Sequence, residues 1–225
     1  VKDALFGKNG VAEGISTGKT IIDCSSINPL VSQRLAKRLT KLKVNFLDAP
    51  VSGGEPGAIK GEIAFMVGGD KKTFNKYKSL LNAMGNSVTL VGPVGAGNTT
   101  KLTNQIIVAL NIAALGEGFS LAKKSGLDPE VVYKAIHTGL AGSTVMDQKM
   151  PKIINQDFKP GFRINLHIKD LQNALDTSHS LHAALPFTSQ VMEILQSEQN
   201  AGNGNDDHSG IAKFYQKINN LKIQK

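Results

Sequence analysis

Cysteine and tryptophan are almost missing from this sequence. Its 225 residues include one cysteine, Cys24, and no tryptophan. A single cysteine excludes a disulfide framework and argues against a cysteine-based zinc site, so we expect no metal centre and a reducing, cytoplasmic compartment. Aromatic residues make up only 5% of the chain, and no basic stretch is interleaved with them as in single-strand binders. Nucleic acid is therefore not an expected partner.

Long apolar runs are also missing. No run approaches the roughly 18 residues of a membrane span, and the N-terminus carries no signal-peptide stretch, so we expect no membrane association. Hydrophobic residues make up 40% and charged residues 20% of the chain. These are the proportions of a soluble globular protein, and they exclude disordered, collagen-like and coiled-coil chains. The formal net charge of +8 suits anionic ligands such as nucleotides or small carboxylates.

Strand and helix patterns alternate up to about residue 94. Short apolar runs predict strands at 20–24, 44–49, 63–68 and 87–91, with a glycine-rich loop at 50–61. One helix is predicted from an Asn28–Pro29 start to about residue 42. Another is predicted over 73–84 with Gly85 as its C-cap. This alternation predicts an α/β layer with a largely parallel sheet.

Helical patterns dominate beyond Gly97. Helices are predicted over 99–125, 128–139, 170–184, 188–199 and 209–219. The sequence therefore predicts an α/β domain over 1–94 and an all-helical domain over 95–225. Nucleotide-binding layers normally open with a strand and a GxGxxG turn, and no such turn occurs here. We therefore expect the α/β domain to lack its front.

The loop after the predicted 44–49 strand is the first candidate site. Ser52 supplies a hydroxyl, and Gly53 and Gly54 expose backbone N–H groups that can close around a carboxylate. Loops at the carboxyl ends of parallel strands bind ligands in open α/β sheets. The alternative is a plain glycine turn, because glycine loops are common.

Lys101 is the second candidate. It would fall in the first turn of a helix capped by Asn98 or Thr99, where a cation opposes the helix dipole. Burial and the positive helix end would both lower the lysine pKa, and a lysine tuned in this way can act as a general acid–base. Asn104 and Gln105 share its helix face and could orient the lysine or the substrate. The alternative is a solvated lysine on a helix surface.

A third candidate lies at Lys169 and Asp170. Asp170 by itself is best interpreted as the N-cap of the predicted 170–184 helix. Lys169 beside it could reach a nucleotide or a carboxylate.

Five stretches carry a resemblance to a known family. They are IIDCSSINP, DAPVSGGEPGAIKGEIAFMVGGD, GAGNTTKLTNQIIVALNIAALGEG, GLAGSTVMDQK and FKPGFRINLHIKDLQNALDTS. Over essentially its whole length, the sequence resembles the β-hydroxyacid dehydrogenase family. The resemblance implies a partial Rossmann-like parallel sheet without its front. A helical domain like that of 6-phosphogluconate dehydrogenase would follow, joined by a long interdomain helix.

The resemblance also implies an oxidoreductase that uses NAD or NADP. Its reaction would be the reduction of a small β-oxo acid, here 2-hydroxy-3-oxopropanoate to glycerate. The alternative substrates are 3-hydroxyisobutyrate, or glyoxylate and succinic semialdehyde. The residue that selects NAD over NADP belongs to the front segment, so the preference stays open. A homodimer or homotetramer is expected. Without the front segment cofactor binding should be poor, and the alternative from another class is a non-catalytic chain that assembles through its helical domain.

Site residues follow from the same resemblance. Lys101 matches the catalytic lysine, which protonates the carbonyl oxygen as hydride arrives. Residues 52–54 match the loop that holds the substrate carboxylate. Many relatives carry an asparagine four residues after the lysine, whereas this sequence has Gln105 there and Asn104 one position earlier. Which of the two amides touches the substrate therefore stays open.

Cofactor contacts are implied at four further positions. Ser26 stands where many relatives have a cofactor-contacting threonine. Phe162, Lys169 and Asp170 match residues that line the site and close over the nicotinamide, with Lys169 contacting the cofactor.

Overall fold

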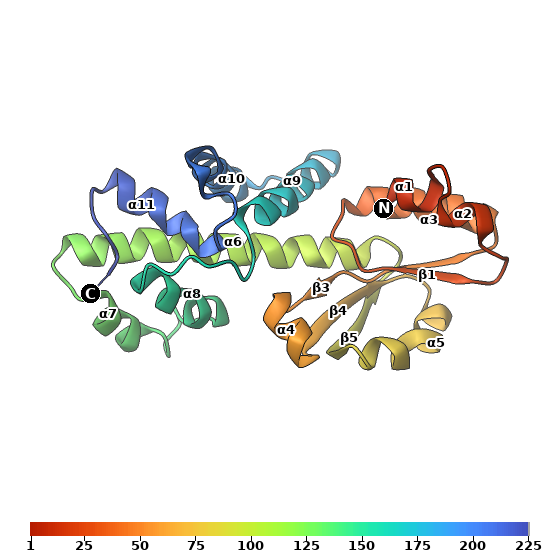
Figure 1. The fold of residues 1–225 in the computed structure, drawn as a ribbon, viewed down its shortest axis with the longest axis horizontal. Coiled ribbons are helices and arrows are strands. Elements are labelled where there is room, and N and C mark those ends of the chain that lie inside the picture. Colours follow the sequence, from red (N-terminus) through yellow and green to blue (C-terminus); the bar gives the residue numbers. More distant parts are fainter. Residues whose placement is uncertain (225) are drawn as a thin grey trace. The chain divides into compact units, whose positions relative to one another are not determined.

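Two compact units make up the protein in a computed structural model that describes residues 1–224 (Figure 1). One unit comprises residues 1–103 with 179–181, and the other comprises residues 104–178 with the chain from 182 onward. The first is an α/β unit and the second is helical.

Five strands form the sheet of the α/β unit. They are β1 (Thr20–Asp23), β2 (Asn45–Asp48), β3 (Val51–Ser52), β4 (Ile63–Gly68) and β5 (Gly85–Gly92). β1 pairs with β2, and β4 pairs with β5, in parallel, whereas β2 and β3 both run antiparallel to β4. The sheet is therefore mixed where a largely parallel one was predicted. A parallel return from β2 would need a full crossover connection, and the only helix between β2 and β4 is the short α4 (Gly54–Lys60).

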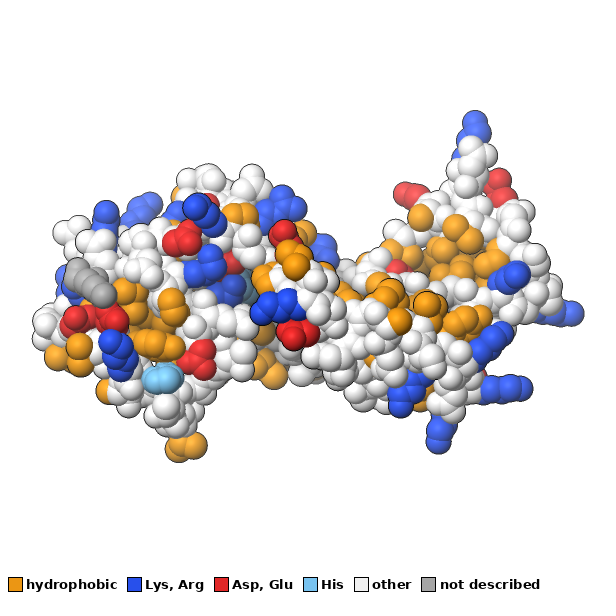
Figure 2. Space-filling view, turned by 60° about the horizontal axis from the view of Figure 1, so that its bottom comes forward, with side chains coloured by type: hydrophobic (Ala, Val, Ile, Leu, Met, Phe, Trp, Pro, Cys, Tyr) orange, Lys and Arg blue, Asp and Glu red, His pale blue; other side chains and the backbone are white. Residues whose placement is uncertain are grey.

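Helices cover both faces of this sheet (Figure 1). They are α1 (Lys2–Phe6), α2 (Val11–Gly14), α3 (Pro29–Lys41) and α5 (Lys71–Asn82), besides α4. Leu35 and Leu39 of α3 pack with Phe46 on one face, and Phe74 and Leu81 of α5 pack with Leu47 on the other. Phe46 and Leu47 are neighbours in β2, so the strand's alternation supplies both cores. Figure 2 shows further hydrophobic side chains gathered in a hollow of this unit.

Helix ends in this unit agree with the sequence at one position and differ at another. The predicted start of α3 is confirmed, because Asn28 Oδ1 accepts the Leu30 N–H at 2.9 Å. Gly85 is not a C-cap but the first residue of β5, in register with Ile63. A side chain at Gly85 would collide with the Ile63 carbonyl oxygen. The glycine is therefore needed for the close approach of two strands, and α5 ends at Ala83.

The segment predicted as a glycine-rich loop is partly ordered structure. It contains β3 and α4, and Gly53 is the residue before the first turn of α4. Gly53 has φ of 132° and Gly54 has φ of 60°, backbone conformations that favour glycine. Both glycines are thus required by the turn from β3 into α4.

The helical unit is built around the long helix α6 (Ala96–Lys124), whose first turns belong to the α/β unit. Its other elements are α7 (Pro129–Ile136), α8 (Thr144–Ile154), α9 (Ile164–Ser180), α10 (Pro186–Glu198), a π-helical turn (Gln199–Asn203), a 3₁₀ turn (His208–Ile211) and α11 (Ala212–Ile218). By length and composition alone α6 could cross a membrane, but half of its most apolar window is buried inside the protein. Such burial is typical of a core helix, as the contacts of Ile112 and Leu115 show.

Two helices of this unit differ from the sequence prediction. α9 begins at Ile164, so Asp170 lies inside the helix and is not its N-cap. The N–H groups of Ile164 and Asn165 donate to main-chain oxygens of Asp206 and Gly204, and a cap of this kind leaves no side-chain signal in the sequence. α8 is not among the predicted helices, and Pro151 in its interior is a helix-breaking signal.

Candidate active site

A buried carboxylate ties the end of strand β2 to the start of α6. Asp48 is fully buried, its Oδ1 accepts the Gly95 N–H at 2.8 Å, and its Oδ2 accepts the Asn98 N–H at 2.8 Å. Helix α6 therefore begins at Ala96 and is capped from another element. The expected cap at Asn98 or Thr99 was wrong. Asn98 instead accepts the Ile27 N–H at 2.9 Å through its own side chain.

Small residues allow this close approach. A side chain at Gly97 would collide with the Met66 and Asp48 main-chain oxygens, and one at Gly68 would collide with the Asp48 carboxylate. Burial raises the pKa of Asp48, although the N–H groups of Gly95 and Asn98 act in the opposite direction. The first turn of α6 is thus fixed to the carboxyl end of β2 by hydrogen bonds that exclude water.

Lys101 lies in the second turn of α6, not the first. The helix dipole acts within the first turn, so the expected unfavourable interaction with the dipole has no basis at this position. The expected burial is present, because Lys101 is only 6% exposed. Lysines are almost never buried to this extent on a plain surface helix, so the solvated alternative does not describe this side chain.

The 52–54 segment belongs to the same unit. Ser52 ends β3 and pairs with Ala64 of β4. It is half-buried, whereas Gly53 and Gly54 are exposed. Their positive φ angles turn successive N–H groups out of the regular strand pattern, as an anion-binding nest requires. The structure thus places an exposed, glycine-dependent turn where the carboxylate loop was expected.

Ser26 follows the carboxyl end of β1 and is half-buried. Asp23, the last residue of β1, is in register with Asp48. Its Oδ1 accepts the Ser25 N–H at 3.0 Å, and its buried Oδ2 has no hydrogen-bond partner among the residues that the structure describes. Ribose hydroxyls and the nicotinamide carboxamide are donors that could satisfy such an acceptor. The carboxyl end of β1 therefore fits a nicotinamide nucleotide.

Charge also favours an anionic cofactor in this unit. Residues 1–103 carry 14 of the 26 lysines and arginines but only seven of the 18 aspartates and glutamates. Nearly all of the chain's excess positive charge lies in this unit, which suits the phosphates of a dinucleotide.

A second group of expected site residues meets within the helical unit. Gln105 is buried and its Nε2 donates to Asp170 Oδ2 at 2.7 Å. The amide of Asn104 in turn donates to Gln105 Oε1 at 2.9 Å. Lys169 Nζ lies 3.0 Å from Asp170 Oδ1. The two amides, the carboxylate and the lysine therefore form one continuous set, in which Gln105 is the central member.

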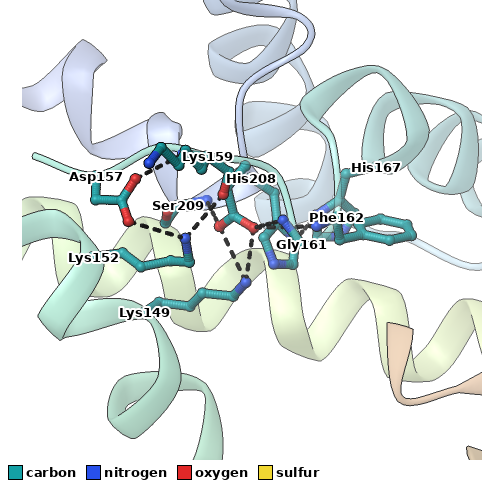
Figure 3. A network of polar contacts seen from close by, with 10 residues as sticks. Lys149, Lys152, Asp157, Lys159, Gly161, Phe162, His167, His208 and Ser209 are labelled. Atoms are coloured by element: carbon teal, nitrogen blue, oxygen red, sulfur yellow. Dashed lines mark hydrogen bonds and ion pairs between the residues drawn. The ribbon is translucent and has the colours of Figure 1, made fainter. Parts of the chain in front are cut away.

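Phe162 is held by a neighbouring polar network (Figure 3). Asp207 is fully buried, and its Oδ2 accepts the N–H groups of Gly161 and Phe162 at 2.9 and 3.2 Å. Lys149 Nζ lies 3.1 Å from both carboxylate oxygens. Burial opposes ionisation of Asp207, but Lys149, His208 and the Ser209 hydrogen bonds outweigh it and hold the Asp207 pKa well below its usual range.

Three buried features were missed from the sequence. They are the Asp48 cap, the Asp207–Lys149 pair, and a contact between His167 and His208. Asp48 and His167 stand in stretches that carry the family resemblance, but their partners lie about 40 to 50 residues away. No local pattern could have joined them. Among residues 1–224, no cluster of three potential metal ligands occurs.

Comparison with known proteins relates these features to a family. A model described as the NAD-binding domain of 6-phosphogluconate dehydrogenase matches residues 1–92. A second, described as NAD-binding of NADP-dependent 3-hydroxyisobutyrate dehydrogenase, matches residues 95–215. The 2-hydroxy-3-oxopropionate reductase of Escherichia coli K12 is 41% identical over 99% of this chain and 76% of its own length. The chain belongs to the β-hydroxyacid dehydrogenase family.

Other members of the β-hydroxyacid dehydrogenase family match almost as completely. The 2-(hydroxymethyl)glutarate dehydrogenase of Eubacterium barkeri is 32% identical over 99% of this chain and 74% of its own length. The crystal structure of a 3-hydroxyisobutyrate dehydrogenase from Salmonella typhimurium superposes with a TM-score of 0.83 at 32% identity, covering 94% of this chain and 74% of that one. The expected fold class, an NAD(P)-binding Rossmann-like unit followed by a helical domain with a long helix, is thereby confirmed. The chain is an oxidoreductase of the NAD(P)-dependent β-hydroxyacid dehydrogenase family.

Proposed function

We propose that this β-hydroxyacid dehydrogenase reduces 2-hydroxy-3-oxopropanoate to glycerate. The 41% identity to the E. coli 2-hydroxy-3-oxopropionate reductase supports this substrate. The observation that carries the mechanism is the burial of Lys101 in a helix whose first turn is fixed to the sheet by Asp48. A bound NAD(P)H supplies the hydride to the carbonyl carbon.

Lys101 is the proposed general acid. Reduction of the carbonyl carbon leaves negative charge on its oxygen, and a lysine ammonium positioned there donates the proton that completes the alcohol. In the reverse direction the neutral amine accepts the hydroxyl proton. Burial supports this role because a site that excludes water strengthens the interaction between the ammonium and the developing charge.

Substrate binding is proposed for residues 52–54 and for the two amides. The Ser52 hydroxyl and the exposed N–H groups of Gly53 and Gly54 would hold the carboxylate, as their positive φ angles support. Between the amides, Gln105 is the better candidate for positioning, because it is buried and joins Asn104 to Asp170. Asn104 is half-buried and is proposed to contact the substrate.

Cofactor contacts are proposed for Ser26, Phe162, Lys169 and Asp170. Ser26 is supported by its position after the carboxyl end of β1, where ligands bind in open α/β sheets. Phe162 is supported by the Asp207 anchor of its N–H. Lys169 is half-exposed and paired with buried Asp170, so its ammonium is oriented while it stays accessible to an anionic group.

A substrate panel tests this function. The names of the relatives cover different acids, so catalytic efficiencies should be compared for 2-hydroxy-3-oxopropanoate, 3-hydroxyisobutyrate, glyoxylate, succinic semialdehyde and 2-(hydroxymethyl)glutarate, each with both nicotinamide cofactors. We expect the highest kcat/KM with 2-hydroxy-3-oxopropanoate. A higher value with another acid would overturn the substrate and leave the family chemistry intact.

Assembly and location are further proposals. We propose a homodimer or homotetramer, which sedimentation would detect, and a cytoplasmic location, in keeping with the single free cysteine. A domain boundary at residues 94–95 is likewise proposed.

A further inference from the structure

Two histidine rings face each other inside the helical unit. His167 of α9 and His208 of the 3₁₀ turn are 1% and 6% exposed. Their Nδ1 atoms lie 2.9 Å apart, which is a hydrogen-bond distance. The Phe162 ring packs against both, with its centroid 5.7 Å from that of His167 and 5.3 Å from that of His208 (Figure 3). None of the proposed chemical steps uses this pair.

The surroundings determine where the protons lie. His167 Nε2 is 3.0 Å from the main-chain oxygen of Gln105. A carbonyl oxygen can only accept, so Nε2 of His167 carries a hydrogen. In a neutral His167 ring Nδ1 is then an acceptor, and the hydrogen of the shared bond must come from Nδ1 of His208. The neutral pair thus has a single arrangement of its protons.

This arrangement accepts one further proton but not two. A proton added to Nε2 of His208 leaves its Nδ1–H donating to His167 as before. A second proton can only enter at Nδ1 of His167, where it places two N–H groups and two positive charges against each other. The hydrogen bond between the rings is then lost.

Charged groups around the pair favour the first proton and oppose the second. Asp207 precedes His208 and interacts with its charge, and Lys149 of α8 pairs with Asp207. On α9, Asp170 and its partner Lys169 lie within one turn of His167, and α6 presents the Gln105 main-chain oxygen. From α11, Lys213 pairs with Asp206 next to Asp207.

The pair is connected directly to the amide–carboxylate set. Gln105 is held by α9 at two points, because His167 bonds its main-chain oxygen and Asp170 accepts from its side chain. His208 holds His167 from the opposite side. Loss of the bond between the rings therefore releases the first turns of α9 from α6.

We propose that His167 and His208 are positioning residues that hold Gln105 and Asp170 in place only while the two rings carry at most one added proton. Substrate affinity should then fall in acid, at the second protonation. The catalytic readout of this inference rests on the proposed function, whereas the arrangement of the protons can be observed without turnover.

Nitrogen-15 spectra of the histidine rings of the whole chain test the proton arrangement. At neutral pH we expect His167 protonated at Nε2 and His208 protonated at Nδ1. The exposed His179 and His182 are internal controls that should titrate independently near the ordinary pKa of about 6.5. A hydrogen on Nδ1 of His167 at neutral pH, or two rings that titrate like the controls, would overturn the proposal.

Two variants test the positioning role. His208→Phe keeps an aromatic ring without the donor, and we expect KM to rise about tenfold at every pH with kcat little changed, the loss typical of one buried hydrogen bond. His208→Asn offers an amide that can donate to neutral His167 or accept from charged His167. Its KM should stay near the wild-type value and lose the rise in acid.

The outcomes separate this proposal from the proposed function. Equal behaviour of the two variants, with the wild-type pH profile unchanged, would show a purely structural role and overturn the proposal. If His208→Phe does not fold, His208→Asn and the nitrogen-15 spectra still decide. If no acid of the substrate panel is turned over, the proposed function fails and the spectra alone decide the proton arrangement.

Discussion

The Asn98 N–H lies 2.8 Å from Oδ2 of Asp48, fifty residues earlier in the chain. The hydrogen bond joins the last residue of β2 to the first turn of the helix that carries Lys101. Since the other Asp48 oxygen accepts the Gly95 N–H, the carboxylate satisfies two main-chain donors at the helix start. The position of the proposed catalytic lysine thus depends on a buried acid outside its own helix.

Replacing Asp48 with asparagine should destabilise the α/β unit. The amide oxygen can satisfy one of the two N–H groups, but the amide nitrogen faces the other, and a buried donor without a partner costs about 1–3 kcal/mol. Chemical denaturation measures this loss. Asn28→Ala is a matched control, because it removes the N-cap of α3, and caps of this type contribute about 1 kcal/mol. If Asp48→Asn cost less than Asn28→Ala, the anchoring role of Asp48 would be wrong.

The proposed carboxylate loop can be tested through its backbone. Gly53 has φ of 132°, and an added Cβ would lie 3.3 Å from Ile63 Cγ2, so Gly53→Ala should strain the turn by about 1–3 kcal/mol. We expect substrate KM to rise while cofactor affinity is unchanged.

Gly57→Ala provides the comparison for the loop. Gly57 lies inside α4, where an added Cβ meets Ile63 Cγ2 at an ordinary 3.6 Å and alanine favours the helix. Steady-state kinetics of Gly57→Ala should match the wild type. An equal rise of KM in both variants would indicate that disturbing the segment, and not the turn at Gly53, changes binding.

Several elements could be predicted because their signals are local. The Asn28 cap, the apolar runs of β1 and β4, and the Asp128–Pro129 start of α7 all lie in or next to the element that they define. The start of α9 could not be predicted, since its free N–H groups bond main-chain oxygens about 40 residues later in the chain. The same holds for α6, whose cap Asp48 precedes it by nearly fifty residues.

The candidate site divides in the same way. Lys101, Gln105 and Asp170 were found through family motifs, and their burial agrees with a role inside the protein. The bond between Gln105 and Asp170 spans 65 residues, and only the folded chain reveals it. Asp207 carried no motif at all, and its importance follows from the donors that converge on it.

Acid should weaken the helical unit through Asp207. Its pKa is held well below the usual range, so the stability that it contributes is present above the ordinary aspartate pKa of about 4 and is lost as the pH falls toward the folded value. Asp207→Asn should cost about 3–5 kcal/mol at pH 7, because it leaves Lys149 buried without its partner. The difference between the variant and the wild type should shrink progressively below about pH 4.

Thermal unfolding between pH 2 and pH 7 measures this effect of Asp207. The exposed Glu130–Lys134 pair on α7 has a similar N–O distance of 3.0 Å, but surface pairs contribute only about 0–1 kcal/mol. Glu130→Gln should therefore change little at any pH. A pH-independent loss in Asp207→Asn would contradict the assignment of a charged, buried Asp207–Lys149 pair.

The most direct test of the proposed chemistry is the single-turnover rate of hydride transfer in Lys101→Met. The variant keeps the buried aliphatic chain and removes the ammonium, and Lys124→Met, an exposed position on the same helix, is the control. We predict that Lys101→Met lowers the rate about 10²–10⁴-fold, the usual contribution of a general acid, with cofactor binding and unfolding temperature unchanged. A rate within a few-fold of the control would show that Lys101 does not deliver the proton.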